Sequence, residues 1–205
     1  MSKRKRLLTQ IATTFFTYFS KIFYILYTVT MYFRKHSNLF EDNYVVLDLE
    51  TTGLKAERCE IIEIGAIRVR NGRPVSQFST LVKPKDGIVP SGITAITHIT
   101  TEMVANAPSI DDVSWWLWDF IGNDPIVGYN IRFDLSFLYL HTNSHFTNTY
   151  IDVLPLCQEH FPGMRHRLTD MSALLKTHAN THRATDDCRA TMELFELYKK
   201  GWPRF

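Results

Sequence analysis

Cysteine is scarce in this chain of 205 residues, which contains only Cys59, Cys157 and Cys188. The three positions are far apart, and no pair of them has the Cys-x-x-Cys spacing of zinc and redox motifs. An odd, scattered set of cysteines therefore excludes a disulfide framework and a paired-cysteine metal site. We expect reduced thiols and a cytoplasmic protein, because disulfides are rare in that compartment.

A hydrophobic run long enough to span a bilayer is also missing. The apolar run from Ile22 to Phe33 is shorter than the roughly 20 residues that a transmembrane helix needs. Extending it back to Leu7 brings in Gln10 and Lys21, and a lysine near the helix centre costs about 2.5 to 3.5 kcal/mol. We therefore expect this segment to be amphipathic rather than membrane-spanning.

Residues 1–43 differ in composition from everything that follows. A basic run, Lys3 to Arg6, precedes a stretch rich in Phe, Tyr, Ile and Thr, and residues 34–43 have the character of a linker. Polar positions fall near one helical stripe, which predicts an amphipathic N-terminal helix with a narrow polar face. Such helices attach to an anionic membrane surface or to a groove on a partner protein. Both targets remain open, as does packing of the helix on its own domain.

Net charge of one sign is weak, at +2 for the whole chain. Residues 1–43 hold seven Lys or Arg against two acids, so sixteen basic residues face nineteen acidic ones in the rest. A mildly acidic body excludes a general electrostatic footprint for nucleic acid. Polyanion binding would have to depend on bound metal and on a local basic spot, for which Arg165, His166, Arg167 and Arg183 are candidates.

Residues 44–200 have the apolar pattern of one α/β domain. The first three predicted strands are joined by turns, one of them Asn71-Gly72-Arg73-Pro74, whereas the later strands alternate with helices. This order implies a mixed five-stranded sheet flanked by helices, close to a ribonuclease H-like arrangement. The predicted strands are 44–49, 61–69, 77–82, 126–128 and 150–153, and the predicted helices lie within 90–107, 111–121, 133–140, 168–175 and 184–198.

Two acids, Asp48 and Glu50, lie at the end of the first predicted strand. Side chains two positions apart on a strand share a face, so both acids point to one side while Leu47 and Leu49 point to the other. Neighbouring carboxylates repel and an uncompensated buried charge is costly, so a cation should lie between them. A hard divalent metal suits such an all-oxygen site. Taken alone, the pattern also fits an edge strand whose acids face water.

Two further acids fall in the first turns of predicted helices. Asp134 ends the strand-to-helix segment that begins at Gly128. A carboxylate in a first helical turn complements the helix dipole, so this position alone does not require a role in the site. In the last predicted helix, Asp187 shares a stripe with apolar residues, whereas Asp186 shares one with Glu193. Asp187 is therefore predicted to face the protein interior and to be the better ligand.

A histidine, His182, precedes these last two acids. Four clustered carboxylates and a histidine are the groups that a two-metal phosphodiesterase needs. Two cations about 3.5 to 4 Å apart stabilise the attacking and the leaving oxygen of the reaction. A histidine, whose free pKa is near 6.5, can take a proton from water.

The order of these motifs resembles that of the DEDDh exonucleases, the DnaQ-like superfamily that includes the proofreading subunit of bacterial replicative polymerases. The resemblance covers about residues 43–199 and rests on Asp48 to Gly53, Asn130 to Asp134 and His182 to Asp187. It implies a metal-dependent exonuclease that releases nucleoside 5′-monophosphates from the 3′ ends of single-stranded DNA. By the same resemblance, His182 would be the general base and two Mg²⁺ or Mn²⁺ ions would be held by Asp48, Glu50, Asp134 and Asp187.

The resemblance also implies substrate contacts. The segment from Ile96 to Met103 is similar to the family segment near the terminal nucleotide, and Leu54 is similar to a residue that packs on its base. The candidate substrate-binding residues are Thr51, Leu54, Thr97 and Ile99. Asp152, at the end of the fifth predicted strand, is expected to cap or support the site rather than to bind metal.

Other functions stay open at this point. An RNA-trimming exoribonuclease would carry the same motifs, because the choice of DNA or RNA depends on contacts to the 2′-hydroxyl. A noncatalytic nucleic-acid-binding module is disfavoured, because it would not need four clustered acids. A zinc site at His178 and His182 lacks a third ligand, and the tryptophans at 115, 116 and 118 are expected to serve packing. The motifs leave open whether the chain associates with a polymerase, and whether it acts in proofreading, in repair or alone.

Overall fold

The computed structural model describes residues 41–142 and 146–203. The predicted N-terminal helix, and the predicted linker up to residue 40, lie outside the described residues. Within the described ranges, no helix combines the length and the apolar composition that crossing a bilayer requires.

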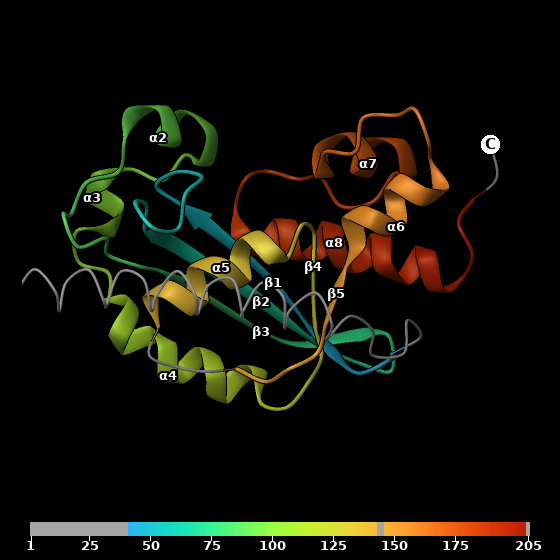
Figure 1. Cartoon of the computed structure of the whole chain (residues 1–205), viewed down its shortest axis with the longest axis horizontal. Helices are drawn as coiled ribbons and strands as arrows, with labels where there is room; N and C mark the ends of the chain where they lie inside the picture. Colours follow the sequence, from blue (N-terminus) through green and yellow to red (C-terminus); the bar gives the residue numbers. More distant parts are fainter. Residues whose placement is uncertain (1–40, 143–145, 204–205) are drawn as a thin grey trace, which may run out of the picture. The chain divides into compact units, whose positions relative to one another are not determined.

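A five-stranded mixed sheet forms the centre of the domain, as predicted. The strand order is β3-β2-β1-β4-β5, in which β1, β2 and β3 pair antiparallel while β4 and β5 run parallel to β1 (Figure 1). The strands are β1 (Tyr44–Thr51), β2 (Ile61–Arg70), β3 (Arg73–Leu81), β4 (Ile126–Gly128) and β5 (Tyr150–Asp152). The helices are α2 (Ser91–Thr97), α3 (Thr101–Val104), α4 (Ile110–Ile121), α5 (Arg132–His141), α6 (Val153–His160), α7 (Leu168–Leu175) and α8 (Ala184–Lys199).

Helix α8 packs across β1 and β2. Tyr44 and Val46 of β1 lie in one buried cluster with Leu194 and Phe195 of α8, to which α6 and α7 also contribute (Figure 1). Because strand side chains alternate, the next residues of β1 on this face are Asp48 and Glu50. The apolar core therefore ends where the acidic positions begin.

The hairpin between β2 and β3 is tighter than the sequence suggested. The predicted turn included Arg73 and Pro74, but both residues pair with β2 in the sheet. Only Asn71 and Gly72 remain in the turn, with φ of 50° and 69°. Positive φ at both positions is typical of the two-residue hairpin turn that Asn-Gly favours. Proline is tolerated in β3 because β3 is an edge strand.

Helix α6 was not predicted, and Val153, which was assigned to a strand, is its first residue. The proline at position 155 falls in the first turn of this helix, where no intrahelical hydrogen bond is lost. Asp152 caps the helix by accepting a hydrogen bond from the backbone amide of Leu154 at 3.1 Å. The capping role predicted for Asp152 is therefore confirmed.

Candidate active site

The site is built from the end of β1 and the first turns of α5 and α8. Asp48 and Glu50 are half-buried on the face of β1 that α8 covers. Their partners across the sheet on β2 are Gly65 and Glu63. In Figure 1 the arrowhead of β1 ends near the start of α8. Strand and helix therefore bring together acids that are more than a hundred positions apart in the sequence.

Asp134 ties α5 to β1. Its side chain is only 3% exposed, and its Oδ1 accepts a hydrogen bond from the backbone amide of Leu49 at 2.9 Å. Leu49 lies between Asp48 and Glu50, so Asp134 is fixed beside both acids. The turn before α5 is held in place by Asp152, whose Oδ1 accepts from the amide of Asn130 at 2.8 Å. Asp152 thus supports the segment that carries Asp134.

The two neighbouring acids of α8 face different surroundings, as the helical register predicted. Asp187 is buried, at 4% exposure, and accepts hydrogen bonds from the side-chain amide of Asn180 at 2.5 Å and the backbone amide of Thr181 at 3.2 Å. Asp186 is partly exposed and binds His178 at 3.3 Å and the Thr181 hydroxyl at 2.7 Å. Asp187 therefore faces the site, while Asp186 fastens the loop that precedes α8.

His182 lies on that loop, is exposed, and has a left-handed backbone with φ of 56°. One ligand atom each of Glu50, His182 and Asp187 lies within 4.8 Å of the others. These three residues could hold a metal ion. Asp48 and Asp134 are not part of this tightest group, although both repel the other acids electrostatically. The structure thus brings His182 together with two of the four predicted acids, Glu50 and Asp187.

The acids hold protons more tightly than ordinary carboxylates. Burial, followed by repulsion from Asp187 and Glu63, raises the pKa of Glu50 to about 8. Burial also raises the pKa of Asp187 to about 7, against hydrogen bonds that lower it. The pKa values of Asp48 and Asp134 are raised well above their usual range, again chiefly by burial. A divalent cation fits this site, because it would relieve the repulsion and because oxygen donors suit hard cations.

The candidate substrate residues differ in how much surface they offer. Leu54 is 85% exposed, as a residue that contacts a base must be. Ile99 is fully buried and packs with Ile62 and Val104, and Thr97 is 3% exposed and donates a hydrogen bond to the carbonyl of Ile93. Both side chains therefore serve the packing of α2 and α3 in this structure.

Thr51 is also buried, and its hydroxyl donates to the carbonyl of Gly53 at 2.7 Å, which shapes the turn before Leu54. Exposed apolar side chains do occur in the segment predicted to approach the terminal nucleotide. They belong to Ile96 and Met103, which are 50% and 40% exposed. Ile96 and Met103 are therefore better candidates for contact with the nucleotide than the buried Thr97 and Ile99.

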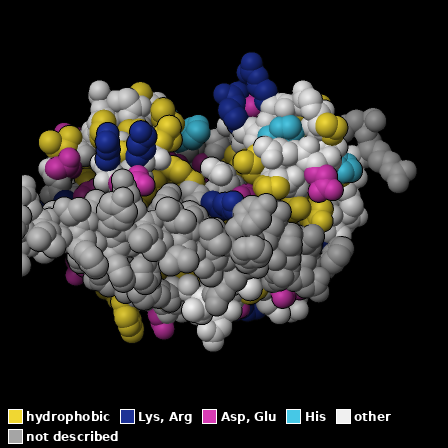
Figure 2. Space-filling view, in the orientation of Figure 1, with side chains coloured by type: hydrophobic (Ala, Val, Ile, Leu, Met, Phe, Trp, Pro, Cys, Tyr) yellow, Lys and Arg dark blue, Asp and Glu magenta, His cyan; other side chains and the backbone are white. Residues whose placement is uncertain are grey.

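The predicted basic spot is partly neutralised. Arg183 binds Glu63, and Arg167 binds Asp170 at 2.7 Å. Figure 2 shows Lys and Arg side chains in separate groups on the face in view, without one continuous basic surface. The expectation that polyanion binding depends on local features therefore fits the charge distribution.

Glu63 is a buried residue that sequence reasoning missed. It is 2% exposed, lies directly across from Glu50, and binds Arg183 with an oxygen-to-nitrogen distance of 2.6 Å. The available signal was an acid between isoleucines in Ile61-Ile62-Glu63-Ile64, a strand that is otherwise apolar. A buried carboxylate in such a strand requires a partner.

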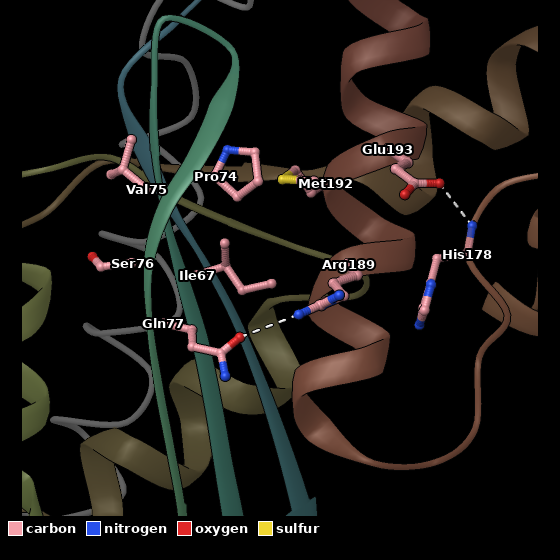
Figure 3. A pocket seen from close by; sticks show the side chains of 9 residues that line it. All are labelled: Ile67, Pro74, Val75, Ser76, Gln77, His178, Arg189, Met192 and Glu193. Carbon is pink, nitrogen blue, oxygen red and sulfur yellow. Dashed lines mark hydrogen bonds between the residues drawn. The ribbon is translucent and has the colours of Figure 1, made fainter.

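A cavity of about 450 Å³ lies elsewhere, between β3 and α8 (Figure 3). Arg189 of α8 reaches across it and donates to the Gln77 side chain of β3 at 3.3 Å. His178 also lines this cavity and pairs with Asp186. No His178 atom belongs to the tight group around Glu50 in the described residues, so the pairing of His178 with His182 at a zinc ion gains no support.

The tryptophans at the surface have two kinds of environment. Trp118 stacks on Phe146 with ring centroids 5.0 Å apart, whereas Trp115 and Trp116 are 69% and 51% exposed. This division agrees with the expected mixture of interior and surface packing.

Comparison with known proteins places this geometry in a family. Residues 45–195 match the family described as Exonuclease. The chain is 32% identical over 179 residues to the DNA polymerase III subunit epsilon of Aquifex aeolicus, a match that covers 84% of this chain and 88% of that protein. It is also 37% identical over 171 residues to the PolC-type DNA polymerase III of Clostridium perfringens, covering 80% of this chain but 12% of the much longer polymerase.

Solved structures show the same fold. The structure of exonuclease X in complex with 5′ overhanging duplex DNA superimposes with a TM-score of 0.63 and 27% identity, covering 78% of this chain and 94% of that one. The mixed sheet, the flanking helices and the match over 45–195 lead to one conclusion. The chain belongs to the exonuclease family and has the ribonuclease H-like fold of the DnaQ-like exonucleases.

Proposed function

We propose that this member of the exonuclease family is a DEDDh-type enzyme that removes nucleoside 5′-monophosphates from the 3′ ends of single-stranded DNA with the help of two Mg²⁺ or Mn²⁺ ions. The observation that carries the proposal is the convergence of Glu50, His182 and Asp187, whose ligand atoms lie within 4.8 Å of one another. They come from a strand, a loop and a helix.

Four acids would hold the ions: Asp48, Glu50, Asp134 and Asp187. When bound, two divalent ions stabilise the charge on the attacking and leaving oxygens of a phosphodiester hydrolysis. The chain contributes acceptors that are fixed before substrate arrives. The Asp134 carboxylate is oriented by the Leu49 amide, and the Asp187 carboxylate is oriented by Asn180 and Thr181. Fixed acceptors need little reorganisation during the reaction.

His182 would act as the general base. Its exposed imidazole can reach a water molecule at the mouth of the site and can pass the proton back to solvent. Its neighbours in the tight group, Glu50 and Asp187, carry negative charge when ionised and would stabilise the imidazolium that forms.

Leu54 would contact the terminal base. A side chain that is 85% exposed on the turn after β1 is available for stacking against a nucleotide without any rearrangement. DNA is favoured over RNA as the substrate because the epsilon and PolC relatives are named as DNA polymerase III proteins and the exonuclease X structure contains DNA. Association with a polymerase is a further option that these names raise.

The test is to incubate the purified full chain with 5′-labelled single-stranded DNA and RNA of the same sequence, with Mg²⁺ or with excess EDTA. The proposal expects a ladder of shortened DNA, nucleoside 5′-monophosphates as product, and no reaction in EDTA. Faster shortening of RNA would make the chain an exoribonuclease. Binding of both strands without hydrolysis would make it a noncatalytic module.

A further inference from the structure

The start of α8 is anchored on β2 by one buried carboxylate. Glu63 accepts hydrogen bonds from Arg183 Nη2 at 2.6 Å and from Arg183 Nε at 3.1 Å. It also accepts from the backbone amide of Ala184, the first residue of α8, at 3.0 Å. The amides of a first helical turn have no partner within the helix. Glu63 thus supplies a cap to α8 from a position 121 residues away.

Close packing of α8 on Gly65, two residues after Glu63 in β2, reinforces this anchor. A Cβ atom added to Gly65 would lie 2.5 to 2.7 Å from backbone atoms of Ala184 and Thr185, so only glycine lets the helix approach this far. The Cys188 thiol donates a hydrogen bond to the Gly65 carbonyl at 3.2 Å. The first turn of α8 therefore rests directly on the backbone of β2.

The anchor lies beside the acids of β1. Glu63 and Gly65 are the partners of Glu50 and Asp48 in the antiparallel pairing of β2 with β1. Arg183 immediately follows His182 and lies one helical turn before Asp187. Any movement of Arg183 away from Glu63 would therefore displace His182 and Asp187 relative to Glu50.

We propose that Glu63 and Arg183 are positioning residues, which set the separation of His182 and Asp187 from Glu50. The inference rests on the proposed metal-dependent nuclease function. Neither residue needs to touch metal or substrate for this role. Their ion pair fixes the end of the loop that precedes α8, and residues behind metal ligands commonly orient those ligands in this way.

The first test is Glu63→Gln in the full chain. The amide oxygen can keep one of the hydrogen bonds, but the amide nitrogen cannot accept from Arg183 or Ala184. We expect kcat and Mn²⁺ affinity to fall about 10- to 100-fold, the usual loss when a partner behind a ligand is removed. The KM for oligonucleotide should change less than about threefold, because no substrate contact is altered. In the metal-free protein, the amides of residues 181–188 should exchange with solvent faster.

Arg183→Lys is the second variant, in case loss of a buried charge prevents Glu63→Gln from folding. It keeps the positive charge but cannot form the planar two-point contact. The matched control is Asp124→Asn, which weakens the Arg70–Asp124 pair, also 2.6 Å long. Arg70 lies seven residues from Glu63 on the same strand, about 23 Å away at roughly 3.3 Å per residue. The control should lower the melting temperature without changing kcat or Mn²⁺ affinity.

Folded Glu63→Gln and Arg183→Lys proteins with the kcat, the Mn²⁺ affinity and the amide exchange of the wild type would overturn the positioning role. A lower melting temperature alone, as in the control, would show a purely structural ion pair and would overturn it too. Failure of the proposed function is distinguishable, because then the wild-type chain itself would neither bind Mn²⁺ nor hydrolyse oligonucleotides.

Discussion

Glu50 and Glu63 lie directly opposite each other on β1 and β2, yet their side chains have different electrostatic surroundings. Glu63 is bound by Arg183 at 2.6 Å, whereas burial and the neighbouring acids raise the pKa of Glu50 to about 8. One carboxylate is neutralised by the chain and serves its architecture. The other belongs to the proposed metal centre, where we expect a divalent cation to relieve the repulsion between the acids.

The raised pKa values predict an unusual dependence of stability on pH in the metal-free protein. Glu50 and Asp187 have pKa values of about 8 and about 7 when folded, against 4.5 and 3.8 as ordinary carboxylates. The folded state therefore binds more protons than the unfolded state between these limits. The contribution of these two groups to the free energy of unfolding is therefore fully present below about pH 4. It is lost as the pH rises through their folded pKa values of about 7 and about 8.

Thermal melts in EDTA from pH 5 to 9 would measure this loss. Mg²⁺ should raise the melting temperature more at pH 8 than at pH 6, because the acids must be ionised to bind it. In the double variant Glu50→Gln and Asp187→Asn, the melting temperature should fall less steeply with pH. An equally steep fall in that variant would assign the effect to other groups.

Asp134→Asn should remove catalysis without unfolding the domain. The amide oxygen can still accept the Leu49 hydrogen bond, so the junction of α5 with β1 survives, but a charged ligand is lost. We expect kcat to fall by at least roughly 100-fold, the scale found when one fixed stabilising group is removed. Single-turnover hydrolysis together with circular dichroism would measure both effects.

Asp152→Asn is the matched control, since its oxygen can likewise keep the hydrogen bonds from Asn130 and Leu154. It should retain most of the activity. A loss as large as that of Asp134→Asn would mean that Asp152 belongs among the ligands.

The neighbouring acids of α8 should differ in importance. Asp187→Ala removes a buried acid of the site, whereas Asp186→Ala only loosens the loop held through His178 and Thr181. His182→Ala should lose about 10² to 10⁴ in kcat, the range for removal of a general base. Comparison of kcat for the three variants at saturating Mg²⁺ would rank them. Equal losses for the two aspartates would contradict the prediction that Asp187 matters more because it faces inward.

A free 3′ end should be required. An exonuclease site accepts a single terminus, so linear single-stranded DNA should be shortened while a circle of the same sequence stays intact. Gel analysis of the linear strand and the circle in one reaction would measure this, with a linear strand blocked by a 3′-phosphate as a third substrate. Cleavage of the circle by pure protein would indicate an endonuclease.

A chain that begins at Glu41 should fold and keep its activity on oligonucleotides. The five-stranded sheet, two buried clusters and the proposed ligands are formed by described residues from 41 on. Glu41 and Asp42 accept hydrogen bonds from Lys199. The kcat should stay within about twofold of the value for the full chain, and the melting temperature should stay within a few degrees. Loss of the fold would show that residues 1–40 belong to the core, against the attachment role expected for them.

Local patterns were sufficient to predict the orientation of several acids. The period of two in β1 put Asp48 and Glu50 on one face, and the helical stripe of α8 separated Asp187 from Asp186; burial in the structure agrees with both. These are relations between residues a few positions apart, in which the geometry of a single strand or helix decides the outcome.

Relations across the fold could not be predicted in this way. The contact of Glu63 with Arg183 joins residues 120 positions apart, and no local period reveals it. Helix α6, whose first turn accommodates a proline, was not predicted, and Val153 was assigned to the preceding strand. Thr97 and Ile99 were chosen by resemblance alone, and their burial depends on how α2 and α3 pack on β2.

The most direct test of the metal centre is anomalous diffraction from crystals of the full chain soaked in Mn²⁺. The account predicts two peaks about 3.5 to 4 Å apart, bounded by Asp48, Glu50, Asp134 and Asp187, with His182 near but not bound to either ion. A single peak coordinated by Glu50, His182 and Asp187, or no peak among these acids, would contradict it.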